Sequence, residues 1–239
     1  MSMEMKKGLS SIVEHTSSKF WIEQIIDDHL EQARQDIRTP GFHASSAGEV
    51  VRCPRLIQLK MNAVVQEKIE ARIKRIFDVG RDVHLRYGRY FRAAGVLVQD
   101  EVRMEIRPDK DDEEFVIVGS ADFIVKNLQG IHKLIELKSM NANNFQKLIE
   151  AGMPVEANLL QWTLYSKGLN IPEGVILYEN KDDQRNKSFS VSFDQSKYDL
   201  VVNAFRSVHC ANKKGVLLSK PAECPDSRFC VAKGLCSHE

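Results

Sequence analysis

The spacing of the hydrophobic residues divides the chain into a helical first part, a mixed middle part and a tail. Apolar residues recur at helical spacing over residues 17–36 and again over residues 69–94. Gly80 and Gly88 interrupt the second pattern, and each of them is a point at which a helix can break. Between the two patterns lies a turn-rich stretch, residues 39–48, followed by a shorter helical segment. This first part is therefore predicted to be mainly helical.

The middle part alternates between apolar and polar residues, which predicts strands. Two short strands are expected over residues 96–98 and 102–106. Two longer strands, residues 114–125 and 131–137, are joined by five residues that end in Gly130, and this predicts a hairpin. Helices follow at residues 143–151, 156–167 and 195–213, and strands follow at residues 174–179 and 188–193. The order predicts an α/β protein with a mixed sheet flanked by helices, ahead of a tail with little periodicity.

The composition is that of an ordinary globular protein and excludes several classes. The 239 residues are 43% hydrophobic and carry a net charge of +1, so no global field would attract a nucleic acid. No apolar run reaches the roughly eighteen residues of a membrane span, and residues 1–10 lack the apolar segment of a signal peptide. We therefore expect a cytoplasmic protein without a membrane partner. Between Ala71 and Arg92, however, seven basic residues stand against two acidic ones, which suits either a phosphate backbone or a solvated helix face.

Two carboxylates and a lysine form the most informative group. Asp122 lies among apolar neighbours in one predicted strand, and Glu136 and Lys138 end the next strand, on one face because they are two residues apart. Carboxylates hold Mg²⁺ or Mn²⁺ through hard oxygen ligands, and the carbonyl of Leu137 offers another. Lys138 would orient the attacking water or offset charge in the transition state. This chemistry suits phosphodiester hydrolysis, although a glutamate and a lysine at this spacing also occur as a simple ion pair.

Asp122 with Glu136-Leu137-Lys138 resembles the motif of the PD-(D/E)xK nucleases, in their RecB-like branch. The segment from Gly80 to His84 resembles the one whose histidine is an additional metal ligand in that branch. The segment from Gln161 to Tyr165 is similar to its Q-x-x-x-Y helix, which implies a role near the scissile strand or the metal ligands. Taken alone, His84 would be a core histidine, and the glutamine and tyrosine the polar edge of a helix. The resemblance implies a restriction-endonuclease-like fold.

Four of the five cysteines form a split set, with one near the start and three near the end of the chain. They are Cys53, Cys224, Cys230 and Cys236. The set resembles the iron–sulfur ligands of nucleases in the same branch, including the CRISPR-associated RecB-like exonuclease and AddB-type nuclease domains. Four thiolates suit a [4Fe–4S] cluster or a structural zinc, and the resemblance favours the cluster. The spacing C-x5-C-x5-C departs from the usual C-x2-C-x5-C. Cys210 has no partner in the motif and is expected to be a buried thiol.

These features together predict a Mg²⁺- or Mn²⁺-dependent DNA nuclease. The resemblance implies exonuclease action on single-stranded ends in recombination, repair, phage DNA metabolism or CRISPR adaptation, in a bacterial, archaeal or phage-infected cell. Residues 51–239 are expected to form the nuclease domain, and residues 1–50 a helical extension open to a protein partner. Arg81, Arg86 and Arg89 are candidates for DNA contacts. The alternatives are a catalytically weak DNA-end-binding or scaffold protein that keeps the iron–sulfur nuclease fold, and an iron–sulfur redox sensor.

Overall fold

The chain forms two compact units, one from residues 1–38 and 68–79 and the other from residues 39–67 and 80–239. The computed structural model describes residues 20–32, 40–64, 69–222 and 230–236. In the first unit, Arg75 forms an ion pair with Asp27 of helix α2 (Trp21–Gln32). The candidate catalytic residues all lie in the second unit.

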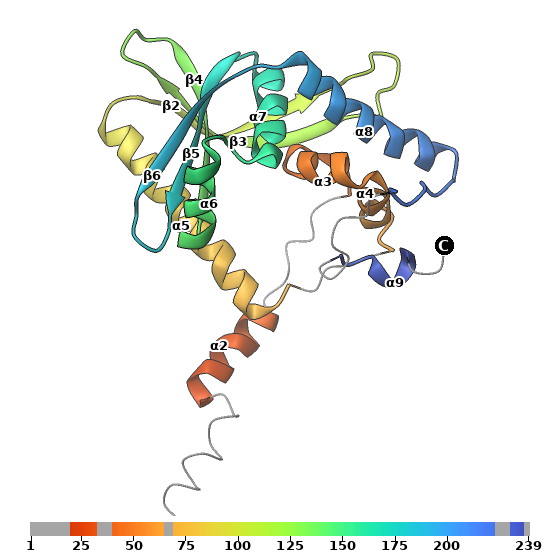
Figure 1. Cartoon of the computed structure of the whole chain (residues 1–239), viewed down its shortest axis with the longest axis horizontal. Coiled ribbons are helices and arrows are strands. Elements are labelled where there is room, and N and C mark those ends of the chain that lie inside the picture. The colour runs from red at the N-terminus through yellow and green to blue at the C-terminus, as the bar shows by residue number, and fades with distance from the viewer. Residues whose placement is uncertain (1–19, 33–39, 65–68, 223–229, 237–239) are drawn as a thin grey trace, which may run out of the picture. The chain divides into compact units, whose positions relative to one another are not determined.

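Six strands form one mixed sheet in the second unit (Figure 1). They are β1 (Phe42–His43), β2 (Leu97–Ile106), β3 (Ile117–Lys126), β4 (His132–Met140), β5 (Glu173–Asn180) and β6 (Asn186–Ser192). β2 pairs with β3 along nearly the whole of both strands and so occupies one edge of β3. β1 and β4 therefore share the other edge, with β1 at Ile117 and Val118 and β4 from Phe123 onward. Residues 119–122 of β3 lie between these two partners.

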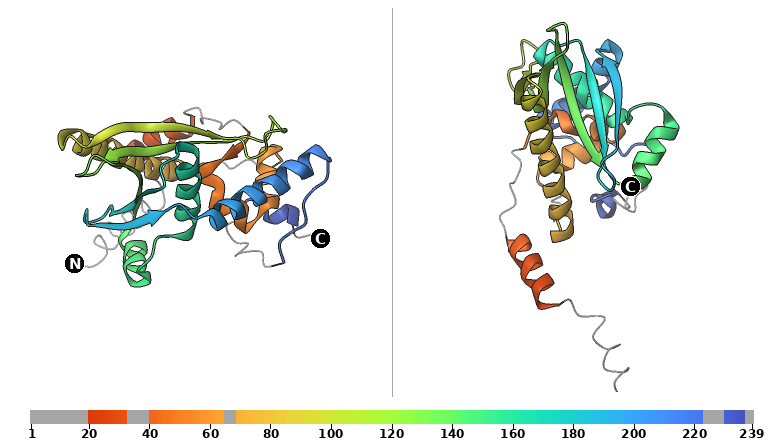
Figure 2. Two further views of the ribbon diagram at one scale, coloured as in Figure 1. Left: turned by 90° about the horizontal axis from the view of Figure 1, so that it is seen from above. Right: turned by 90° about the vertical axis from the view of Figure 1, so that its left-hand side faces the viewer.

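Helices cover both faces of the sheet. They are α3 (Ala47–Arg52), α4 (Pro54–Met61), α5 (Ala71–Ala93), α6 (Ala142–Ala151), α7 (Glu156–Leu169) and α8 (Gln195–Lys213), with the short α9 (Lys233–Cys236) near the end of the chain. On one face, α7 and α8 bury a large core that includes Trp162 and Phe205. On the other face, Val83 and Tyr87 of α5 pack against Phe123 of β3. Figure 2 shows the strands standing between α5 and α6 in its right-hand view. The predicted mixed sheet flanked by helices is confirmed.

The structure corrects two local predictions. β2 is one strand rather than two, because its pairing with β3 continues through the polar residues Gln99 and Asp100. Residues 39–48, predicted as turns, include β1 and the start of α3, where Gly48 packs directly on Ala157 of α7. A Cβ on this glycine would lie 2.4 Å from the Cβ of Ala157, so the sequence needs glycine there for packing and not for a turn. By contrast, the long helix predicted over residues 69–94 is confirmed, because α5 continues through both of its glycines.

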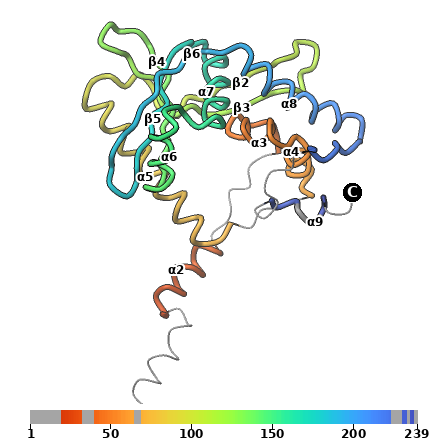
Figure 3. Tube along the Cα trace, in the orientation of Figure 1, coloured from red at the N-terminus to blue at the C-terminus, as the bar shows by residue number. Residues whose placement is uncertain are grey.

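Other elements follow their predictions closely. α8 has the predicted bounds, residues 195–213. β3 and β4 form the predicted antiparallel hairpin, which the trace in Figure 3 follows from one strand into the next. Within the described residues, no helix combines the length and apolar character needed to cross a membrane.

Candidate active site

Asp122 and Glu136 lie where β3 and β4 diverge. The last paired residues of the two strands are Phe123 and Ile135, and the two acidic residues come next on each strand. Beyond this point β4 stays paired with β5 only, because the edge of β3 that it leaves is taken up by β1. The carboxylate of Asp122 spans the fork, since its Oδ2 accepts the backbone N–H of Leu137 at 2.7 Å. The backbone thus brings two acidic side chains to one opening in the sheet.

Gln161 of α7 ties the glutamate to the lysine. Its Nε2 donates to Glu136 Oε1 and to the hydroxyl oxygen of Tyr165, both at 2.9 Å. Its Oε1 accepts from Lys138 Nζ at 3.2 Å, and that ammonium lies 2.7 Å from Glu136 Oε1. Glu136 and Lys138 both face α7 because alternate residues of a strand point to one side. The structure therefore brings four of the predicted residues into one hydrogen-bonded group.

Gly119 makes room for this group. A Cβ at residue 119 would lie 2.6 Å from Cε1 of Tyr165 and 3.0 Å from the side chains of Ala44 and Met104. A contact of 2.6 Å is impossible for a real side chain, so any other residue here would displace the tyrosine ring or the strand. The glycine at the head of the Gly119–Asp122 segment is thus a packing requirement of the site.

Burial dominates the electrostatics of the two carboxyl groups. Glu136 is 1% exposed, and its Oε2 has no hydrogen-bond partner among the described residues. Burial, and next the charge of Asp122, raises the pKa of Glu136 to about 7. Burial likewise raises the pKa of Asp122 to about 7. Burial opposes the charge of Lys138, but the carboxylate of Glu136 outweighs it and the pKa of Lys138 is raised. The site thus holds carboxyl groups that take up protons near neutral pH and a lysine that stays charged.

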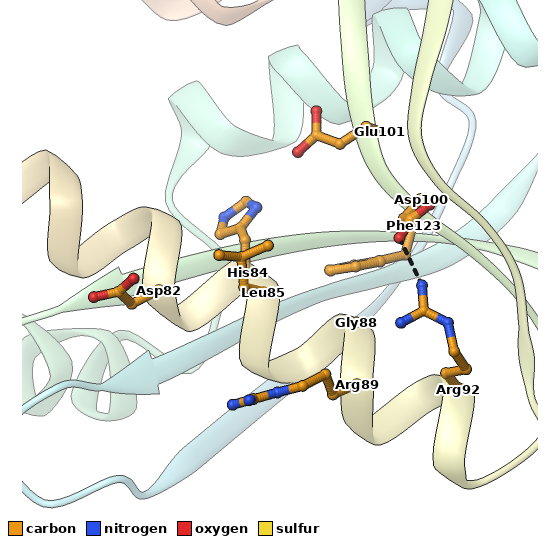
Figure 4. Close-up of a pocket in the computed structure, with 9 residues that line it drawn as sticks. All are labelled: Asp82, His84, Leu85, Gly88, Arg89, Arg92, Asp100, Glu101 and Phe123. Atoms are coloured by element: carbon orange, nitrogen blue, oxygen red, sulfur yellow. Dashed lines mark hydrogen bonds and ion pairs between the residues drawn. The ribbon is translucent and has the colours of Figure 1, made fainter.

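α5 brings His84 to the other side of Asp122. His84 Nδ1 lies 3.4 Å from Asp122 Oδ1, and the ring is hydrogen-bonded to the backbone of Leu137. Burial lowers the pKa of His84, so its imidazole is neutral at pH 7 and can serve as a metal ligand. His84 also lines a cavity of about 500 Å³, together with Arg89 and Glu101 (Figure 4). The predicted proximity of His84 to the carboxylates is therefore observed.

Sequence reasoning missed Glu101. This residue of β2 stands opposite Asp122 in the register, because Asp100 pairs with Phe123 and Val102 with Ala121. Its φ of +50° is in the left-handed region, which is unusual for a residue other than glycine. The signal in the sequence that could have identified this residue is the acidic pair Asp100-Glu101, which lies between the two short strands predicted over residues 96–98 and 102–106. Among the described residues, no three side chains of His, Cys, Asp or Glu type converge closely enough, as they stand, to hold a metal ion.

The three arginines predicted to contact DNA differ in their surroundings. Arg89 lines the cavity beside His84. Arg86 forms an ion pair with the buried Glu179 and donates to Gln184 Oε1 at 2.7 Å, so its guanidinium group is bound within the protein. Arg81 is exposed on α5.

Two of the four described cysteines, Cys53 and Cys230, lie in one region of the fold. Cys53 lies between α3 and α4, and it belongs to a small buried cluster that Cys230 packs against. Cys236 ends α9 and is half-buried. Cys224 lies outside the described residues. Cys210 corrects a prediction, because it is exposed on α8, one residue beyond the last of the buried pair Val208 and His209.

Comparisons with known proteins find likeness at the level of structure only. No family model and no curated protein matches this chain. The solved structure described as SSO0001 is 17% identical, with a TM-score of 0.56, and the match covers 90% of this chain and 93% of that one. The alkaline exonuclease LHK-Exo from Laribacter hongkongensis is 15% identical, with a TM-score of 0.55 and coverage of 74% and 90%. Its complex with dAMP is 16% identical, with a TM-score of 0.56 and coverage of 79% and 93%. These matches establish a shared fold, and the mixed sheet flanked by helices is consistent with the predicted restriction-endonuclease-like fold.

Proposed function

We propose that this protein is a metal-dependent nuclease that hydrolyses phosphodiester bonds of DNA, with Asp122, Glu136 and Lys138 as its catalytic group. The observation that carries the proposal is the fork between β3 and β4. There a buried glutamate with an oxygen unpartnered within the described residues stands beside a second carboxyl group and a charged lysine. The likeness in fold to a protein described as an exonuclease, also solved with dAMP, supports the same conclusion.

The residues at the fork fit a hard divalent cation. The strongest sign of a cation site is Oε2 of Glu136, a buried oxygen that receives no hydrogen bond from the described part of the chain. A carboxylate kept out of water needs a compensating positive charge. Asp122, Glu136, the neutral His84 and the carbonyl of Leu137 are the residues that would hold Mg²⁺ or Mn²⁺. When bound, the cation supplies a Lewis acid that draws electron density from the scissile phosphate.

The chain's own residues supply the rest of the chemistry. Lys138 stays protonated, so its ammonium can donate to a phosphate oxygen as negative charge builds up there. Gln161 holds the ammonium and the glutamate in one arrangement through 3.2 and 2.9 Å hydrogen bonds. Tyr165, 3% exposed, supports Gln161 from the same face of α7. These two are positioning residues, and their loss would lower the rate without removing the catalytic group.

The finer assignment is an exonuclease that acts on single-stranded DNA ends. A cavity beside His84, lined by Arg89, is where a strand end with its phosphate would lie. Arg81 and Arg86 remain candidates for DNA contacts, the second only if its ion pair with Glu179 opens. A protein partner for the N-terminal region is likewise proposed from the sequence alone.

Four cysteines are proposed to hold a [4Fe–4S] cluster, with zinc as the other occupant. Cys230 packs against the small buried cluster that contains Cys53, although the two residues are far apart in sequence, and this supports a shared centre. Purified protein that is brown and loses iron in Cys230→Ser would support the cluster. A colourless protein with stoichiometric zinc would replace the iron–sulfur proposal.

The test of catalysis uses end-labelled single-stranded DNA and an equal amount of circular single-stranded DNA. We expect cleavage of the linear strand with Mg²⁺ or Mn²⁺, none with a chelator, and none in Lys138→Met. Lys133→Met is the matched control, because Lys133 is on the same strand in an ion pair with Glu173 and away from the fork. Loss of activity in the control alone, or full activity in Lys138→Met, would overturn the assignment. Cleavage of the circle would remove the requirement for an end.

A further inference from the structure

The first compact unit, residues 1–38 and 68–79, exposes apolar side chains along α2. Four of them recur at intervals of three and four residues and so form one apolar stripe along the helix. They are Trp21, Ile22, Ile25 and Ile26. Among the described residues of this unit, only Asp27 and Ala71 are buried. A helix at a protein surface ordinarily buries its apolar side and exposes its polar side, so α2 is turned the opposite way.

The polar side of α2 is the one that contacts the rest of the unit. Arg75 of α5 forms an ion pair with Asp27, and the ammonium of Lys74 donates to the backbone carbonyl of Leu30. Asp27 lies about half a turn around the helix from Ile25, because each residue advances the helix by roughly 100°. The contacts that α2 makes with α5 therefore leave its apolar stripe uncovered.

The start of α5 adds to the exposed apolar surface of the unit. Ile76 and Val79 are both exposed, and they share one side of α5 because they are three residues apart. Trp21 alone is 71% exposed, which amounts to about 150 Å² at roughly 200 Å² for a whole aromatic side chain. With the aliphatic side chains the apolar surface reaches several hundred Å², a size that marks an interaction site on a monomer.

The charges of the two helices indicate what covers this surface. α2 has four acidic residues and no lysine or arginine, whereas residues 71–79 of α5 have three basic residues and one acidic residue. The acidic helix would repel the phosphates of a nucleic acid. It also lacks the lysines and arginines by which a helix binds a membrane surface. A second copy of the same unit matches both helices, because it brings a basic segment to the acidic helix and an acidic helix to the basic segment.

We propose that two copies of this chain associate through the first compact unit, with the apolar stripe of α2 in one copy packed against the start of α5 in the other. Asp28 borders the stripe, three residues after Ile25, and Arg72 lies on the same side of α5 as Ile76; both charged side chains are exposed. A two-fold arrangement joins Asp28 of each copy to Arg72 of the other. The second copy is then the protein partner of the N-terminal region, and the association depends on no residue of the nuclease site.

Sedimentation equilibrium of the full chain tests the association. We expect a dimer at high micromolar concentration that dissociates on dilution, and a dissociation constant roughly tenfold higher for Ile25→Glu, which would bury a charge. Leu128→Glu is the matched control, because Leu128 is 99% exposed in the loop between β3 and β4, and this variant should associate like the unchanged protein. An unchanged protein that stays monomeric would overturn the inference, whichever other macromolecule the stripe binds. An Ile25→Glu protein that associates as tightly as the control would overturn it too, and neither result would bear on the nuclease function.

Charge reversal tests which residues meet across the two copies. Asp28→Arg and Arg72→Asp should each weaken the association roughly tenfold, because each variant sets like charges against each other at both contacts. An equal mixture of the two variants should associate as tightly as the unchanged protein, since both contacts of the mixed pair again join opposite charges. Misfolded variants could not be restored in this way. A mixture that associates no better than either variant alone would overturn the proposed arrangement.

Discussion

Replacing Glu136 by glutamine should stabilise the metal-free protein, and more so as the pH rises. Glutamine has the shape of a protonated glutamate, so it keeps the packing of a side chain that is 1% exposed. It also removes a buried negative charge whose Oε2 has no donor within the described residues. The ion pair with Lys138 is lost as well, but the pKa of Glu136 is raised to about 7 even with that attraction present. The balance therefore favours the neutral side chain.

The size of the effect follows from proton linkage. The pKa of Glu136 rises from 4.5 to about 7 on folding, so between these values the folded state binds more protons than the unfolded state. Stability from this group is complete below the unfolded pKa and falls as the pH rises toward 7. Between pH 5.5 and pH 8 this loss is about 2 kcal/mol, at roughly 1.4 kcal/mol per pKa unit. Glutamine does not titrate, so the variant should gain about 2 kcal/mol relative to its parent over the same range.

Urea unfolding in the presence of a chelator, at pH 5.5 and at pH 8, measures this difference. Glu173→Gln is the control, because Lys133 lowers the pKa of Glu173 and the variant should show no gain with rising pH. A Glu136→Gln protein that loses stability relative to the parent between pH 5.5 and pH 8 would refute the reasoning. The same variant should also fail to gain stability from added Mn²⁺, since one of the proposed ligands is gone.

Two further predictions follow from local packing and charge. Gly119→Ala should reduce nuclease activity and unfold at a lower temperature, because its Cβ displaces Tyr165. Gly80→Ala, whose Cβ would have nothing within 4 Å, should raise the free energy of unfolding by about 1 kcal/mol. Equal shifts of the unfolding temperature in the two variants would contradict the packing argument. Asp112→Asn should lose more stability at pH 7 than at pH 2. Lys213 and His209 lower the pKa of Asp112 to about 2, so the contribution of this carboxylate is present above its ordinary pKa and is lost as the pH falls through 2. Chemical denaturation at the two pH values measures the stability of Asp112→Asn. A variant that is weakened equally at both pH values would contradict this prediction.

The parts of the site that could be predicted from the sequence are those with a local signature. Glu136 and Lys138 two apart on a strand must share a face, and Gln161 and Tyr165 one turn apart must share a helix face. The spacing within each pair therefore predicts one shared surface for that pair. What brings the two surfaces together is the placement of α7 over β4, which depends on contacts between residues about 25 apart and has no local pattern.

Glu101 shows why the rest could not be predicted. Its place opposite Asp122 depends on the register of β2 with β3, and its direction depends on one backbone angle. The polar run that includes it breaks the alternation and splits β2 into two predicted strands. The prediction that Cys210 is buried was wrong for a related reason, because a shift of one position around α8 decides whether a side chain is buried or exposed. The error at β2 and the omission of Glu101 thus have one cause, since alternation is lost where the backbone turns a side chain toward a site. A break in an otherwise regular strand that faces a predicted catalytic residue is therefore itself a reason to look for a further member of the site.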